Sequence, residues 1–307
     1  MIIKHWSKEE KYYGLYYGFS LEKAVNEEFA KYYAAYINID IGFKSSYEQK
    51  CSVVVPDDNC YWIKLDNVRV GGAFLEPNHV EGLFLIPPFK DTYKVLKLIK
   101  NVLTSWSDKS KDIKATTVGP AEVDYYHMLG FRTLEESHWM MRPTEAYFSY
   151  WEDKYEIRTP RIDDAEELGK FFFEAFNDYV GKIKYSHEDR TSFVKDYFNN
   201  KSLNELLLKA STLVYDKVTN ELIGACLISE YRGWPLVSDI AVKSTYRGLS
   251  LATRMLKKAL TVTKERYPAM RLFVLCGNEA ESVYYNLGFI PGVKLTDLYI
   301  PAEMTDK

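Results

Sequence analysis

The clearest change in hydrophobic pattern along the chain lies between residues 237 and 267. Residues 237–242 are short, β-branched and apolar, which is typical of a buried strand. After a polar break, apolar side chains recur at the 3.6-residue spacing of an amphipathic helix, at Leu251, Met255, Leu256, Ala259 and Leu260. The pattern therefore predicts a strand, a tight loop and a helix over residues 251–267.

The rest of the chain also alternates between predicted strands and helices. Strands are predicted at residues 51–55, 60–65, 68–75, 80–86, 113–118, 155–159, 211–216, 222–230, 271–275 and 295–300. Helices are predicted at residues 21–37, 93–106, 121–129, 165–176, 187–197, 203–210 and 279–287. Ser20 is expected to cap the first of these helices. This order of elements predicts a mixed α/β fold.

The order of elements in the first half repeats in the second. Residues 119–131 align without a gap with residues 277–289, and both segments end in Leu-Gly-Phe. Residues 85–90 fall at the position of residues 242–247. We therefore infer a tandem duplication, with domains at residues 1–145 and 146–307.

Composition limits the partners and the location of the protein. The 307 residues are 47% hydrophobic and carry a formal net charge of −3, so neither nucleic acid nor a membrane is expected as a partner. No run approaches the ~20 apolar residues of a membrane-spanning helix, and the first residues lack the apolar core of a signal peptide. The chain is expected to be soluble and cytoplasmic.

The cysteines and histidines show no metal-ligand spacing and no disulfide framework. No metal is therefore expected. Cys276 is expected to be an interior cysteine of a strand.

The loop between the predicted strand and helix has the features of an anion site. The first N–H groups of a helix have no partner within it, and they carry the positive end of the helix dipole. Arg247 adds a cation, and Gly248 permits close approach of the backbone to a ligand. The alternative is an ordinary strand-loop-helix unit whose arginine lies on the surface.

These residues resemble a known motif. The run from Ile240 to Leu256 resembles the acetyl-CoA-binding motif of the GNAT acetyltransferase superfamily, whose loop reads Arg/Gln-x-x-Gly-x-Gly/Ala. Ser250 stands at the central glycine of that motif, where a Cβ is expected to crowd the pyrophosphate or resist a positive φ. The resemblance implies two tandem GNAT-like domains, each a central mixed sheet flanked by helices. It implies acetyl-CoA binding by Ile240, Ala241, Val242, Arg247, Gly248, Leu249, Ser250, Leu251, Ala252 and Asn278.

The resemblance also implies roles in catalysis. The backbone N–H of Val242 would meet the acetyl carbonyl, and Tyr284, four residues before the glycine of Leu-Gly-Phe, would be the general acid. The alternative is that Tyr284 is a core aromatic, because Tyr126 occupies the matching position of the first half. Tyr285 is the less favoured candidate for the acid.

The acidic residues expected nearest the reaction centre are Asp239 and Glu230. Either one is a candidate base for the acceptor amine, or a binding group for its ammonium form; the alternative is that both lie at solvated strand ends. Tyr231 and Trp234, in the loop between them, are expected to line the acceptor pocket.

The first half lacks these features. It reads Lys90-Asp-Thr-Tyr-Lys-Val95 where the second half reads Arg247-Gly-Leu-Ser-Leu-Ala252, so it has no glycine there, and Asp91 opposes a phosphate. We interpret it as a degenerate copy.

The sequence thus predicts an acetyl-CoA-dependent N-acetyltransferase acting on a small-molecule amine or an amino terminus. One alternative is a non-catalytic acyl-CoA sensor or interaction module. Another is an aminoacyl transferase, which would need a basic groove that the sequence does not show.

Overall fold

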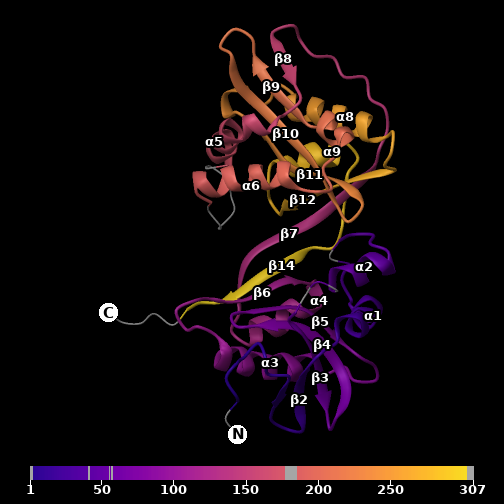
Figure 1. Cartoon of the computed structure of the whole chain (residues 1–307), viewed down its shortest axis with the longest axis vertical. Helices are drawn as coiled ribbons and strands as arrows, with labels where there is room; N and C mark the ends of the chain where they lie inside the picture. Colours follow the sequence, from indigo (N-terminus) through magenta and orange to yellow (C-terminus); the bar gives the residue numbers. More distant parts are fainter. Residues whose placement is uncertain (1–2, 41, 55, 57, 177–184, 303–307) are drawn as a thin grey trace. The chain divides into compact units, whose positions relative to one another are not determined.

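The computed structural model describes residues 3–40, 42–54, 56, 58–176 and 185–302, and the chain forms two compact units (Figure 1). The first unit comprises Met1–Ser137 and Val293–Lys307, and the second comprises His138–Gly292. The units divide within strand β7 (Arg132–Pro143), and β14 (Leu295–Ile300) belongs to the first unit. The domain boundary predicted at residues 145 and 146 stays a prediction, and it does not anticipate this placement of β14.

The first unit is a mixed sheet covered by helices. Its helices are α1 (Asn26–Tyr36), α2 (Tyr47–Val54), α3 (Thr92–Trp106) and α4 (Pro120–Met128). Its other strands are β1 (Tyr12–Gly14), β2 (Phe19–Lys23), β3 (Cys60–Leu65), β4 (Val68–Glu76), β5 (His79–Leu85) and β6 (Ile113–Val118). The strand order is β1-β2-β3-β4-β5-β6-β14-β7, and the neighbours are antiparallel except for β5 and β6, which are parallel.

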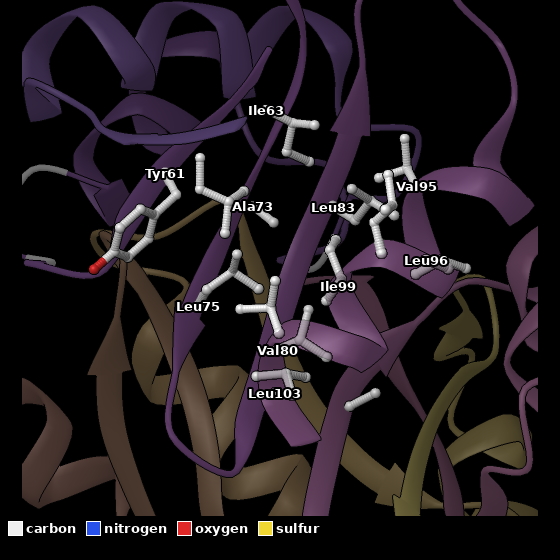
Figure 2. Packing of buried hydrophobic residues seen from close by; sticks show 14 of the residues in the cluster. Tyr61, Ile63, Ala73, Leu75, Val80, Leu83, Val95, Leu96, Ile99 and Leu103 are labelled. Atoms are coloured by element: carbon white, nitrogen blue, oxygen red, sulfur yellow. The ribbon is translucent and has the colours of Figure 1, made fainter. Parts of the chain in front are cut away.

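Side chains alternate between the two faces of this sheet, as the pleat requires. Tyr61 and Ile63 of β3 belong to the core that includes α3, whereas Trp62 between them belongs to the core that includes α1. Figure 2 shows the first of these cores, with Val95, Leu96, Ile99 and Leu103 of α3 among side chains of the strands. Both faces are therefore apolar because both are covered by helices.

The second unit repeats this architecture. Its strands are β8 (Tyr155–Arg158), β9 (Thr212–Asp216), β10 (Glu221–Tyr231), β11 (Trp234–Val242), β12 (Ala269–Leu275) and β13 (Ile290–Pro291). Its helices are α5 (Ala165–Phe176), α6 (His187–Asn199), α7 (Glu205–Ala210), α8 (Leu251–Thr263) and α9 (Ala280–Asn286). The strand order is β7-β12-β11-β10-β9-β8, β13 pairs with β7, and β11 and β12 are parallel.

Helices cover both faces of the second sheet as well. Figure 1 shows α5 and α6 on one side of β10, β11 and β12, and α8 and α9 on the other. Leu227 of β10 packs in the α5–α6 core, and its neighbour Ile228 packs in the α8–α9 core. Neither these helices nor those of the first unit, within the described residues, are long and apolar enough to span a membrane.

The two copies of the Leu-Gly-Phe segment adopt the same turn. Gly130 has a φ of 89° and Gly288 a φ of 84°. The N–H of Phe131 donates to the carbonyl of Tyr126 at 3.1 Å, and the N–H of Phe289 donates to that of Tyr284 at 3.0 Å. The mixed α/β fold predicted from the sequence is confirmed.

In the first unit, one predicted strand and the start of one predicted helix were wrong. Residues 51–54 of the strand predicted at residues 51–55 are the end of α2, which packs on α1, and residue 55 lies outside the described residues. The helix predicted from residue 21 is a strand until Lys23, and Ser20, expected as its N-cap, lies within β2 between β1 and β3. Short apolar runs do not distinguish a strand from a turn of helix, and tertiary contacts decided both cases.

Candidate active site

The centre of the second sheet opens between its two parallel strands. The ladder between β11 and β12 contains only the pairs Leu236–Arg271 and Val237–Leu272. Just beyond them, β11 carries a bulge, because Ser238 is an extra residue relative to β10. A bulge bends and twists its strand. Past this point a cleft of about 650 Å³ is lined by residues of both strands, of α5, and of the beginnings of α8 and α9.

The backbone of β11 presents N–H groups on the side of this cleft. The N–H of Lys243 donates to the carbonyl of Ile223 in β10 at 2.9 Å. Because bonded and non-bonded pairs alternate in an antiparallel ladder, the N–H groups of Val242 and Ile240 face away from β10. Ile240, Ala241 and Val242 all line the cleft. The structure thus brings these three predicted residues together beside β12.

The N-terminus of α8 lies at the same cleft. Its N-cap residue, Ser250, makes no side-chain capping hydrogen bond and has φ 61° and ψ 18°. Arg247, Gly248, Ser250, Leu251 and Ala252 line the cleft, whereas Leu249 does not and is 45% exposed. The N–H groups and dipole of this helix end favour an anion at this position.

The loop before α8 contains two residues in the left-handed region, and they predict opposite effects of substitution. A Cβ on Gly248, whose φ is 79°, would meet no atom of the described residues within 4 Å. Gly248→Ala is therefore expected to cost about 1–2 kcal/mol through backbone strain alone. Ser250→Gly relieves strain at φ 61° and is expected to stabilise the fold by up to about 1 kcal/mol. Calorimetry of both variants checks this, and melting temperatures that shift in the same direction would contradict it.

Tyr284 enters the cleft from α9. Its side chain is 7% exposed, and its ring packs edge-on against Phe289 with centroids 6.2 Å apart. Asn278, just before α9, also lines the cleft. Tyr285 is 69% exposed and is not among the lining residues. Of the two tyrosines considered from the sequence, only Tyr284 lines the cleft.

Asp239 lies at the cleft beside α5 and α6. It follows the bulge and shares a face of the sheet with Ala241, which packs in the α5–α6 core. Its carboxylate lies 4.0 Å from the guanidinium of Arg190 on α6, with 27% of its side chain exposed. Burial raises the pKa of Asp239 to about 6, against the opposing effect of Arg190. This carboxyl changes charge close to neutral pH, as a general base requires.

Arg190 was not predicted from the sequence. Its guanidinium stacks on Phe176, at 4.7 Å from the ring centroid, and Phe176 lines the cleft. In the sequence Arg190 is one charged residue among several on an amphipathic helix. No local signal distinguishes it, because its role depends on the packing of α6 against α5.

The other three predicted residues lie outside the lining of the cleft. Glu230 accepts a hydrogen bond from the hydroxyl of Tyr267 at 2.8 Å, so the structure favours Asp239 over Glu230 as the base. Tyr231 stacks on Trp139, which in turn contacts the cleft residue Phe273.

Trp234 stacks instead on the buried Arg271, with the guanidinium 5.2 Å from the ring centroid. Tyr231 is therefore connected to the cleft through two aromatic rings, whereas Trp234 is not among the residues that line it.

The corresponding region of the first unit is built differently. The side chain of Asp91, the N-cap of α3, accepts a hydrogen bond from the N–H of Lys94 at 3.0 Å. The hydroxyl of Thr117 in β6 donates to Glu81 in β5 at 2.7 Å, just past the end of their parallel ladder. The carboxylate of Asp91 thus occupies the N-terminus of α3, where an anionic ligand would bind. The hydrogen bond between Thr117 and Glu81 joins β6 and β5 where the corresponding strands of the second unit are open.

Comparison with known protein families gives a match for most of the second unit. Residues 182–294 match the family model described as "Acetyltransferase (GNAT) domain". No curated protein sequence matches the chain.

Solved structures resemble the chain over nearly its full length. A GCN5-related N-acetyltransferase from Sphaerobacter thermophilus is 14% identical, with a TM-score of 0.68 over 94% of this chain and 98% of that one. A tandem GNAT protein from the clavulanic acid biosynthesis pathway is 11% identical, with a TM-score of 0.58 over 94% and 100%. A putative acetyltransferase from Pyrococcus horikoshii is 13% identical, with a TM-score of 0.51 over 99% and 95%. At these identities the likeness establishes the fold.

Proposed function

We propose that the second unit transfers an acetyl group from acetyl-CoA to an amine, because residues 182–294 match a GNAT acetyltransferase domain and the chain is similar in fold to a tandem GNAT protein. The acceptor is the amine of a small molecule or an amino terminus. The observation that carries this proposal is the N-terminus of α8, whose N-cap residue Ser250 makes no side-chain capping hydrogen bond and which lies at the cleft between β11 and β12. The matching helix of the first unit is capped by Asp91, which supports its interpretation as a degenerate copy.

The residues at the cleft fit acetyl-CoA. Arg247 and the first N–H groups of α8 would hold the diphosphate, and Gly248 leaves open space beside it. The N–H groups of Ile240 and Val242, and the side chain of Asn278, would hold the pantetheine arm and the acetyl carbonyl. When bound, acetyl-CoA supplies the acetyl group as a thioester.

The remaining chemistry belongs to two side chains. Asp239 takes up a proton from the acceptor ammonium, and its pKa of about 6 leaves it ionised at neutral pH. Tyr284 holds at its hydroxyl the proton that the leaving sulfur takes up. They come from opposite faces of the sheet, since Tyr284 packs in the α8–α9 core and Asp239 lies beside Arg190 of α6. The acceptor therefore enters on the side of α5 and α6.

We place this activity in the cytoplasm, with no nucleic acid or membrane as partner. The cysteines of the described chain form no disulfide, which supports a reducing compartment.

A binding experiment tests the proposal. Acetyl-CoA is expected to raise the melting temperature, and Arg247→Glu is expected to remove most of this shift. Charge-assisted hydrogen bonds contribute about 1.5–3 kcal/mol, so losing them weakens Kd about 10- to 100-fold. Isothermal titration measures Kd directly. Lys90→Glu is the matched control, since it makes the same change at the corresponding position of the first unit. No shift with saturating acetyl-CoA, or equal losses in both variants, would overturn the proposal.

A further inference from the structure

Three side chains with acid–base or nucleophilic chemistry meet in the second unit apart from Tyr284 and Asp239. His138 comes from β7, Cys276 from the turn after β12, and Glu281 from α9, and all three are half-buried. The Sγ of Cys276 lies 3.5 Å from Nδ1 of His138. The Oε1 of Glu281 lies 3.2 Å from Nε2 of the same ring. Cys276 is therefore not the interior strand cysteine expected from the sequence.

The protonation of the imidazole follows from its partners. The N–H of Gly277 donates to Oε2 of Glu281 at 3.1 Å, which holds the carboxylate in place. An ionised carboxylate carries no proton and lies 3.2 Å from Nε2 of His138, so it favours the tautomer of the ring that has its proton on Nε2. In the neutral ring Nδ1 is then the unprotonated nitrogen, and it faces the thiol. The ring is thus oriented to accept the proton of Cys276.

The same three residue types also occur as metal ligands, and their ligand atoms lie within 4.8 Å of one another. A metal ion binds one nitrogen of an imidazole, so the other ligands converge on that nitrogen. Here the sulfur and the carboxylate lie at different nitrogens of His138. This is the order of a nucleophile, a base and an orienting carboxylate.

We propose that Cys276 is a nucleophile activated by His138, that Glu281 positions the histidine, and that the thiol accepts an acyl group from a thioester. The proton of the thiol moves to Nδ1, and Sγ attacks the carbonyl carbon. The new carbon–sulfur bond forms as the bond to the leaving sulfur breaks. The leaving thiolate then takes the proton from Nδ1. No oxidant or reductant takes part, and the products are an S-acyl cysteine and a free thiol.

The nucleophile is tested first by alkylating the folded wild-type protein with iodoacetamide. Mass spectrometry measures the rate of alkylation at each cysteine separately. Cys51 is the internal control, because it is also half-buried but its Sγ contacts the carbonyl of Ala30 at 3.6 Å instead of a base. At pH 7 Cys276 is expected to react at least about tenfold faster than Cys51. Equal rates for the two cysteines would overturn the proposal without any variant.

The roles of the partners are tested by the pH profile of the same reaction. A thiol paired with an imidazole keeps reacting below pH 7, whereas an ordinary thiol with a pKa of about 8.5 does not. His138→Ala is expected to reduce the rate at Cys276 to that of Cys51 and to move the profile to higher pH. Glu281→Gln is expected to move the profile in the same direction by a smaller amount. An unchanged profile in both variants would overturn the relay.

Acyl transfer is tested with S-acetyl-N-acetylcysteamine, a thioester that lacks the nucleotide and so does not depend on the acetyl-CoA cleft. One acetyl group is expected on Cys276 of the wild-type protein and none on Cys276 of His138→Ala. No acetylation of Cys276 would overturn its role as an acyl acceptor, whatever the outcome for acetyl-CoA binding. Retention of one Zn²⁺ per chain after dialysis, with Cys276 protected from iodoacetamide, would overturn the relay in favour of a metal site.

Discussion

Replacing Tyr284 by Phe is expected to lower kcat about 10²- to 10³-fold while changing the KM for acetyl-CoA little. Only the hydroxyl is lost, and a positioned general acid contributes about 10²–10⁴-fold to a rate. The phenyl ring still fills the buried position against Phe289, so the melting temperature should fall only slightly. Release of free CoA measured at saturating acceptor gives kcat, and the acetyl-CoA dependence gives KM.

The first unit provides a matched control for this substitution. Tyr126 occupies the repeated position, is 3% exposed and packs edge-on against Phe131 at 5.1 Å. Tyr126→Phe therefore removes the hydroxyl from the same position of the repeated turn but outside the lining of the cleft, and kcat should be unchanged. If Tyr284→Phe kept more than about half of the wild-type kcat, Tyr284 would be a packing residue in both copies.

Replacing Asp239 by Asn is expected to lower kcat/KM about 10²-fold at pH 7.5, because the amide cannot accept the proton of the acceptor ammonium. The wild-type kcat/KM should also fall with decreasing pH, since burial raises the pKa of this carboxyl to about 6 and protonation removes the base. The variant should lack this acidic limb. Initial rates between pH 5 and 8 measure both effects, and an acidic limb that persists in Asp239→Asn would assign it to another group.

Asp239→Asn, which is expected to lower activity, should raise the stability of the fold relative to wild type as the pH rises. The pKa of Asp239 is higher in the folded state than its ordinary value of 3.8, so folding favours the protonated form. That contribution is fully present below pH 4 and is lost as the pH rises through about 6. Asparagine remains neutral throughout.

The melting temperature of Asp239→Asn relative to wild type is therefore expected to increase between pH 5 and pH 7.5. A constant difference across this range would show that the folded-state pKa is not raised. A variant that is more stable at pH 7.5 and yet nearly inactive would separate the chemical role of Asp239 from any structural one.

The parts of the site that a single local segment encodes were predictable from the sequence. Residues 237–260 contain the strand, the loop and the helix that meet at the cleft, and their periodicity and turn residues indicate this directly. Tyr284 was predicted from its spacing to the glycine of Leu-Gly-Phe, as the family resemblance implies, and that spacing is also local. The left-handed φ of Ser250 confirms the backbone conformation that the glycine of the motif suggested.

Residues that depend on long-range packing were not predictable. Arg190 reaches Asp239 only because α6 packs beside α5, and His138 meets Cys276 only because β7 lies next to β12. Each of these pairs is far apart in the sequence, and no hydrophobic periodicity links the two members of a pair. The misassignment of residues 51–54 has the same cause, because contact with α1 holds them in a helix that the β-branched Val53 and Val54 do not favour.

The pairing of β14 has a consequence for the order in which the protein can be assembled. This strand lies between β6 and β7 in the sheet of the first unit, although it follows the whole of the second unit in the chain. A ribosome that has made residues 1–137 has therefore not yet made an interior strand of the sheet to which they belong. Until residues 295–300 emerge, the edge of β6 in the nascent first unit has no partner strand. An unpaired edge is prone to aggregate, so this is the interval in which a chaperone would protect the nascent chain most.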